Sequence, residues 1–279
     1  MLSYIETLIV LACIYVVLAS SFNLVLGFAG ILAFCQAAFY GLGAYSSTLL
    51  SLRLGWPLIP AAIAGMAVAA LLSLLVSWPS VRVRGVYFVI VSLGFQMIVF
   101  YAMLNGGDAT GGGTGLRAIP KLPALASWDY NLVAVAYAVI LAAAVLLFCW
   151  RLAISPFGRV LKGIREDEVA CQSLGKNVAL FKILCFAVCA ALAALAGVLY
   201  ARYVRFISPD SFGVDETFFI FSILVIGGAG SVKGPIAGAA FGVLLPEALK
   251  FLPLQSDRSS ALLQVIFGAL MILVLRFRP

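Results

Sequence analysis

Long apolar runs separated by short polar breaks constrain the fold of this chain more than any other feature. A helix needs about 20 apolar residues to cross a bilayer. Charged residues make up only 10% of the 279 residues, whereas a soluble domain has about a quarter. The sequence therefore predicts one all-α, polytopic membrane domain over 1–279, with about nine transmembrane segments and a range of eight to ten. The runs are 7–26, 31–52, 57–78, 86–105, 130–151, 179–203, 216–229, 234–251 and 259–277.

Two of these runs have features of broken or re-entrant helices. Gly41 and Gly43 interrupt the run 31–52, and the short run 216–229 ends in a glycine-rich turn. Irregular backbone at membrane depth is tolerated where it is buried in protein or lines a cavity. Leu26–Gly30 and Ile226–Gly230 are alike, which indicates either an internal repeat with paired sites or a chance match between small-residue helices.

Polar side chains within the runs supply further candidates for a translocation pathway. Asn23 and Gln36 flank the first glycine turn, where amides either line a pathway or, in the interpretation we favour, hold helices together. Glu247 either faces a cavity or is hydrated at the outer interface, and the sequence favours neither. The expected pathway residues are Asn23, Gln36, Gly41, Gly43, Gly227, Gly228, Gly230 and Glu247.

Basic residues set the expected orientation. If the loop 151–178 is cytoplasmic, eleven Lys and Arg lie inside and seven outside, in accord with the positive-inside rule. The N-terminus and the loop 106–129 are then external, and the first run, which no basic region precedes, is a retained span rather than a signal peptide. The net charge of +7 fits contact with anionic membrane lipid and not nucleic acid, because the few basic residues are spread over an apolar chain.

The cytoplasmic loop 153–178 combines an apolar stripe with both signs of charge. Ser155 and Pro156 predict the start of a helix over 156–175, and Gly175 predicts its end. Its acidic residues argue against the alternative of a helix lying on anionic lipid, and the pattern fits a groove on a partner protein. We therefore expect a coupling helix whose contact residues are Arg159, Arg165, Glu166, Asp167, Glu168, Leu174 and Gly175.

Catalytic chemistry is poorly supported by the composition. The chain has no histidine, and its six cysteines include no C-x-x-C pair, so we expect no metal site and no cofactor, with the cysteines serving as packing residues. The stretch 227–235 superficially resembles a phosphate-binding loop but lacks the G-K-[ST] ending. Any ATP must therefore be hydrolysed by a partner.

Several motifs together carry a resemblance that covers nearly the whole chain. They are Asn23–Gly30, Gln36–Tyr45, Arg84–Phe88, Thr110–Leu116, Phe157–Gly175, Ile207–Ser211 and Gly227–Pro235. The chain resembles the M-type inner-membrane permeases of high-affinity branched-chain amino acid ABC importers. This resemblance implies a location in the bacterial cytoplasmic (inner) membrane, a heterodimer with a second homologous permease, two cytoplasmic ATPase subunits and an external solute-binding protein. The expected docking residues for the binding protein are Thr110, Gly111, Gly112 and Gly115.

The solute is the most open part of this expectation. Gln36 stands where the family often has His, so the specificity differs from the family's if this position touches the solute. The resemblance implies branched-chain or related amino acids, with urea or short amides, which close relatives carry, as the alternative. A secondary transporter or channel is a weaker alternative, because the runs hold few ionisable groups and the cytoplasmic helix would have no role. An intramembrane enzyme lacks a base or metal ligand set.

Overall fold

The structure, a computed structural model, describes residues 2–83, 85–107, 110–121, 130–250 and 268. Over these residues the predicted all-α class is confirmed. The last expected run, 259–277, lies outside the described residues. The helices are α1 (Leu2–Asn23), α2 (Gln36–Leu54), α3 (Leu58–Arg82), α4 (Val86–Leu104), α5 (Tyr130–Ile154), α6 (Pro156–Glu166), α7 (Glu168–Ser173), α8 (Val178–Val204), α9 (Val214–Gly227) and α10 (Gly234–Lys250).

Five helices in the described part of the chain are long and apolar enough to cross a membrane. These spans are Tyr4–Phe28, Leu58–Arg82, Val86–Leu104, Tyr130–Ile154 and Val178–Val204. The first consists of α1 and the π-helical turn Leu24–Phe28 that continues it. By comparison α9 and α10 are short, with 14 and 17 residues. Large apolar side chains such as Ile59 and Ile98 are exposed on the long helices, as expected of positions that face lipid.

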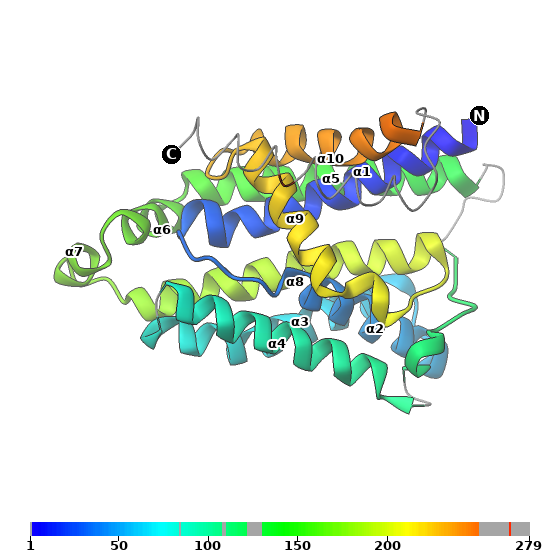
Figure 1. The fold of residues 1–279 in the computed structure, drawn as a ribbon, viewed down its shortest axis with the longest axis horizontal. Helices are drawn as coiled ribbons and strands as arrows, with labels where there is room; N and C mark the ends of the chain where they lie inside the picture. Colours follow the sequence, from blue (N-terminus) through cyan, green and yellow to red (C-terminus); the bar gives the residue numbers. More distant parts are fainter. Residues whose placement is uncertain (1, 84, 108–109, 122–129, 251–267, 269–279) are drawn as a thin grey trace.

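The long helices lie side by side, and the two ends of the bundle differ (Figure 1). The short helices α6 and α7 protrude at one end, which we call the α6–α7 end. The N-terminus and the loops that follow α4 and α8 lie at the opposite, N-terminal end. These two loops are joined there by an antiparallel bridge between Leu116 and Ile207. The described parts of the loops 151–178 and 106–129, which we expected on opposite sides of the membrane, thus lie at opposite ends of the bundle.

The second crossing begins as irregular chain rather than helix. Residues 29–35 are not helical, and in Figure 1 they pass from the α6–α7 end into the middle of the bundle, where α2 starts at Gln36. Helix α2 is continuous through Gly41 and Gly43. The broken helix that we expected in the run 31–52 is therefore present, but its break lies before Gln36 and not at the two glycines.

Side chains from two other helices accept hydrogen bonds from the first backbone N–H groups of α2. The first N–H groups of a helix have no partner within the helix. The N–H of Ala37 donates to Thr217 Oγ1 of α9 at 3.1 Å, and the N–H of Ala38 donates to Gln96 Oε1 of α4 at 2.7 Å. Water is scarce at membrane depth, so these bonds make a mid-bundle helix start tolerable.

The glycines of α2 and α8 serve close packing. A Cβ on Gly43 would overlap the backbone of Ala194, and a Cβ on Gly197 would overlap the carbonyl oxygen of Tyr40. A Cβ on Gly41 would lie 2.9 Å from Phe212 Cγ. Small residues let the backbones of neighbouring membrane helices approach closely, which explains glycines in a helix that does not break.

Helix α9 crosses the other helices obliquely and leads into a tight turn before α10 (Figure 1). Gly228 and Gly230 in this turn have φ of 98° and 85°, a region that side chains disfavour. A Cβ on Gly238 would overlap the carbonyl oxygen of Ile223. The turn therefore depends on glycine both for its backbone conformation and for the approach of α10 to α9.

Candidate functional site

The loop 153–178 folds into two short helices rather than the single helix expected over 156–175. Helix α6 starts as predicted, because Ser155 Oγ accepts a hydrogen bond from the N–H of Gly158 at 3.3 Å and Pro156 occupies the first turn. At Asp167 the backbone leaves the helical region, with φ −151° and ψ 108°. Asp167 Oδ1 then accepts from the N–H of Val169 at 2.8 Å and so caps α7.

The outward face of this pair of helices carries exposed apolar side chains among its charges. Leu174 is 78% exposed and Val169 is 60% exposed. The expected contact residues Arg159, Arg165, Glu166, Asp167 and Gly175 are exposed as well. Val169 was not among the residues expected from the sequence. The signal that could have identified it is Asp167, whose capping role starts a new helix and changes which residues face outward.

Two of the expected contact residues, Arg165 and Glu168, bond inward to the bundle. Arg165 Nη1 donates to the carbonyl oxygen of Gly27 at 2.7 Å. Glu168 Oε1 forms an ion pair with Lys182 Nζ of α8 at 2.9 Å, and Lys182 also donates to the carbonyl oxygen of Ser80 at 3.4 Å. Lys182 is only 5% exposed. No local pattern marked Lys182, because the pair joins residues on two different helices.

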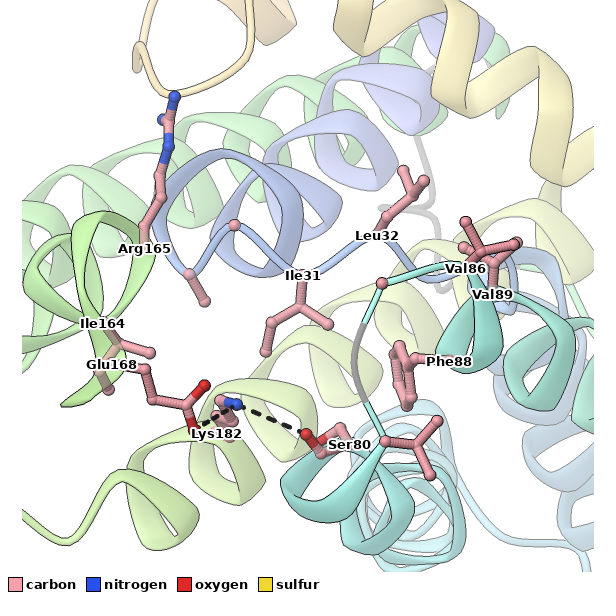
Figure 2. A pocket seen from close by; sticks show the side chains of 14 residues that line it. Ile31, Leu32, Ser80, Val86, Phe88, Val89, Ile164, Arg165, Glu168 and Lys182 are labelled. Carbon is pink, nitrogen blue, oxygen red and sulfur yellow. Dashed lines mark hydrogen bonds and ion pairs between the residues drawn. The ribbon is translucent and has the colours of Figure 1, made fainter. Parts of the chain in front are cut away.

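These inward contacts border a cavity of about 350 Å³ at the α6–α7 end. Figure 2 shows the Glu168–Lys182–Ser80 contacts on one side, with Arg165 reaching away from them toward the turn between α9 and α10. Ile31, Phe88 and Ile164 supply apolar wall. The cavity thus separates two attachments of the α6–α7 pair to the bundle.

The two similar glycine turns meet in space at this end. Asn23 Oδ1 accepts from the N–H of Gly230 at 2.7 Å, and Asn23 Nδ2 donates to the carbonyl oxygen of Ser231 at 2.8 Å. A Cβ on Gly27 would lie 2.5 Å from the backbone nitrogen of Gly230. Asn23 thus joins the end of α1 to the α9–α10 turn. Of the expected pathway residues, the structure brings Asn23 and Gly230 together here, and Gly227 and Gly228 belong to the same turn.

The remaining expected pathway residues lie elsewhere. Gln36 is buried between α1 and α8, where its Nε2 donates to Ser21 Oγ at 2.7 Å and its Oε1 accepts from Cys189 Sγ at 3.3 Å. Gly41 and Gly43 follow it in α2. Glu247 accepts a hydrogen bond from the hydroxyl of Tyr4, which places it toward the N-terminal end. The pathway candidates therefore occupy both ends and the middle of the bundle.

The loop after α4 is a compact turn held to its helix. Thr110 Oγ1 donates to the carbonyl oxygen of Met103 at 2.7 Å, and Gly111, Gly112 and Gly115 have φ of 73°, 51° and 70°. These four expected docking residues are half-buried, whereas Thr114 between them is exposed. Residues 108–109 and 122–129 of the expected loop 106–129 lie outside the described residues, as does Arg84 of the motif Arg84–Phe88.

Comparison with known proteins decides the family. The model of the family described as the branched-chain amino acid transport system / permease component matches residues 4–275. The chain belongs to this permease family. Its apolar helices and its permease relatives together make it a multi-pass membrane protein. No solved structure matches the chain at a significant level.

Individual relatives support this assignment. The high-affinity branched-chain amino acid transport system permease protein LivM of Escherichia coli (strain K12) is 34% identical over 297 residues, which cover 96% of this chain and 67% of the relative. LivM of Salmonella typhimurium is 34% identical over 294 residues, or 95% and 67% of the two chains. A probable LivM of Methanocaldococcus jannaschii is 31% identical over 231 residues, or 80% and 66%.

Proposed function

We propose that this chain is the permease subunit of an ATP-driven ABC importer that carries branched-chain or related amino acids across the bacterial cytoplasmic membrane. A second homologous permease completes the pathway, two cytoplasmic ATPase subunits supply energy, and an external binding protein delivers the solute. The α6–α7 end is then cytoplasmic, and the loop 106–129 faces the binding protein. Membership of the permease family supports this proposal.

The observation that carries the proposal is the outward face of α6 and α7. A short pair of helices that protrudes from an apolar bundle, with Val169 and Leu174 exposed beside both signs of charge, suits insertion into a groove on a soluble protein. Lipid is a poor occupant, because Glu166 and Asp167 would face an anionic leaflet. An energy-coupling role accounts for these features.

The test replaces the apolar contacts by charge in the complete transporter. Leu174→Glu combined with Val169→Glu should abolish co-purification of the ATPase subunits, because each substitution buries a charge in an apolar contact. Arg151→Ala, at the same end of the molecule on α5, serves as the control and should leave co-purification unchanged. ATPase binding that survives the double substitution would refute the docking role of α7.

The solute is tested in the same reconstituted system. Proteoliposomes that hold the complete transporter should take up labelled leucine only when ATP is present inside and the binding protein outside. Urea or acetamide in large excess should not compete. Uptake without ATP would favour a secondary transporter, and competition by urea or acetamide would favour the amide-carrying alternative.

A further inference from the structure

Arg165 of α6 occupies the junction at which the two glycine turns touch. Its Nη1 donates to the carbonyl oxygen of Gly27 at 2.7 Å. A Cβ on Gly230 would lie 3.1 Å from the same nitrogen, and a Cβ on Gly30 would lie 2.7 Å from Arg165 Cγ. The arginine side chain thus lies close to glycine backbone on both turns, and a Cβ at Gly30 would require it to shift.

Asn23 closes this junction from the side of α1. Its side-chain oxygen and nitrogen bond to the backbone of Gly230 and Ser231 at 2.7 and 2.8 Å, and Asn23 is only 2% exposed. Asn23, Gly27, Arg165 and the turn residues Gly230 and Ser231 form what we call the glycine junction. It joins the end of α1, the α9–α10 turn and α6, which lie far apart in the sequence.

We infer that Arg165 is a positioning residue that makes α6, the end of α1 and the α9–α10 turn move as one unit. This inference rests on the proposed function. The ATPase subunits would act on the outward face of α7, and the bundle must be moved through contacts on the inward face. A planar guanidinium offers several donors in a fixed fork, so it can hold a backbone carbonyl while it packs against the neighbouring turn.

The second inward attachment differs in kind. Glu168 and Lys182 hold α7 to α8 across the cavity, away from Arg165 (Figure 2). This pair fixes the α6–α7 helices to the bundle but does not reach the glycine turns. Of these two attachments, the Arg165 contact reaches the end of α1 and the α9–α10 turn, and the ion pair does not.

The experiment compares ATP hydrolysis with solute uptake in the complete transporter. Arg165→Ala should keep ATPase co-purification and ATP hydrolysis, while the number of ATP molecules hydrolysed per solute rises about tenfold, the size expected from loss of one charge-assisted hydrogen bond. Arg165→Lys, which retains a charged donor, should give a smaller rise. Arg151→Ala is the matched control and should leave the ratio unchanged.

The ratio separates positioning from mere structural support. Loss of folded protein lowers hydrolysis and uptake together and leaves their ratio unchanged, so an unchanged ratio in Arg165→Ala would overturn the inference. Asn23→Ala should raise the ratio too. The rise in the double variant should be smaller than the product of the two single rises, because the effects of residues in one network are not additive. Independent, multiplying effects would show that Asn23 and Arg165 do not act together.

The proposed function and this inference fail in different ways. If the unaltered transporter shows no ATP-dependent uptake, the proposed function is wrong and the inference falls with it. If the unaltered transporter works and Arg165→Ala retains normal coupling, the proposed function stands and only the role of the glycine junction is refuted.

Discussion

At the scale of single residues, the ion pair of Glu168 and Lys182 is the most consequential contact outside the glycine junction. The side chains are 14% and 6% exposed, and the charged atoms are 2.9 Å apart. Removing one partner of a buried pair costs more than removing both, because the remaining charge stays in a poorly hydrated place. The ammonium of Lys182 depends on Glu168 for this reason.

We predict that Glu168→Gln lowers the free energy of unfolding by about 3 kcal/mol. The double variant Glu168→Gln/Lys182→Met should lose less, since no buried ammonium remains. Thermal unfolding in detergent measures both. Glu166→Gln, an exposed neighbour, is the control and should change stability by less than about 0.5 kcal/mol. Equal losses in the single and double variants would contradict the prediction.

At the scale of secondary-structure elements, α2 relies on two other helices. Its start depends on Thr217 and Gln96, which belong to α9 and α4. Gln96 also donates through Nε2 to the carbonyl oxygen of Phe212 at 2.8 Å. One amide therefore connects α2, α4 and the turn before α9, and its loss leaves two buried backbone groups without a partner.

Gln96→Leu should therefore destabilise the protein by about 2 kcal/mol, as expected when buried polar groups lose their bonds. Gln172→Leu on the exposed side of α7 is the matched control for the same change in chemistry. Thermal unfolding in detergent again gives the measurement. A Gln96→Leu protein as stable as the control would mean that the start of α2 finds other partners.

The elements also show how far sequence reasoning reaches. The apolar runs predicted α1, α3, α4, α5 and α8 closely, because each of these spans is apolar over a length that can cross a membrane. Ser155 predicted the start of α6 correctly, and Gly175, the predicted helix end, lies two residues after the last residue of α7. The break at Asp167 was missed because capping there competes with an apolar stripe that continues past it.

Contacts between distant residues account for what could not be predicted. Asn23 and Ser231 are 208 positions apart, and Arg165 and Gly27 are 138 apart. No local spacing marks such pairs. The glycine motifs signalled that the two turns matter, but only the fold shows that they touch each other and that Arg165 touches both.

At the scale of the whole molecule, exposed positions lie at opposite ends of the bundle, and this makes the orientation testable. We predict that a cysteine at Thr114, in a cysteine-free background, reacts with an impermeant thiol reagent added to intact cells. A cysteine at Gln172 should react only after the cells are opened. Both positions are exposed, so access to the reagent depends on membrane side. The reverse labelling pattern would invert the proposed topology.

The helix start in the middle of the bundle has a consequence for biosynthesis. A ribosome delivers α2 to the membrane before α4 and well before α9, yet the N–H of Ala37 takes its partner from Thr217, which is synthesised 180 positions later. Until then the backbone at the start of α2 needs water or another temporary acceptor. The hydrogen bond between Ala37 and Thr217 therefore forms only after α9 has been synthesised, which makes the start of α2 one of the late steps in assembling the bundle.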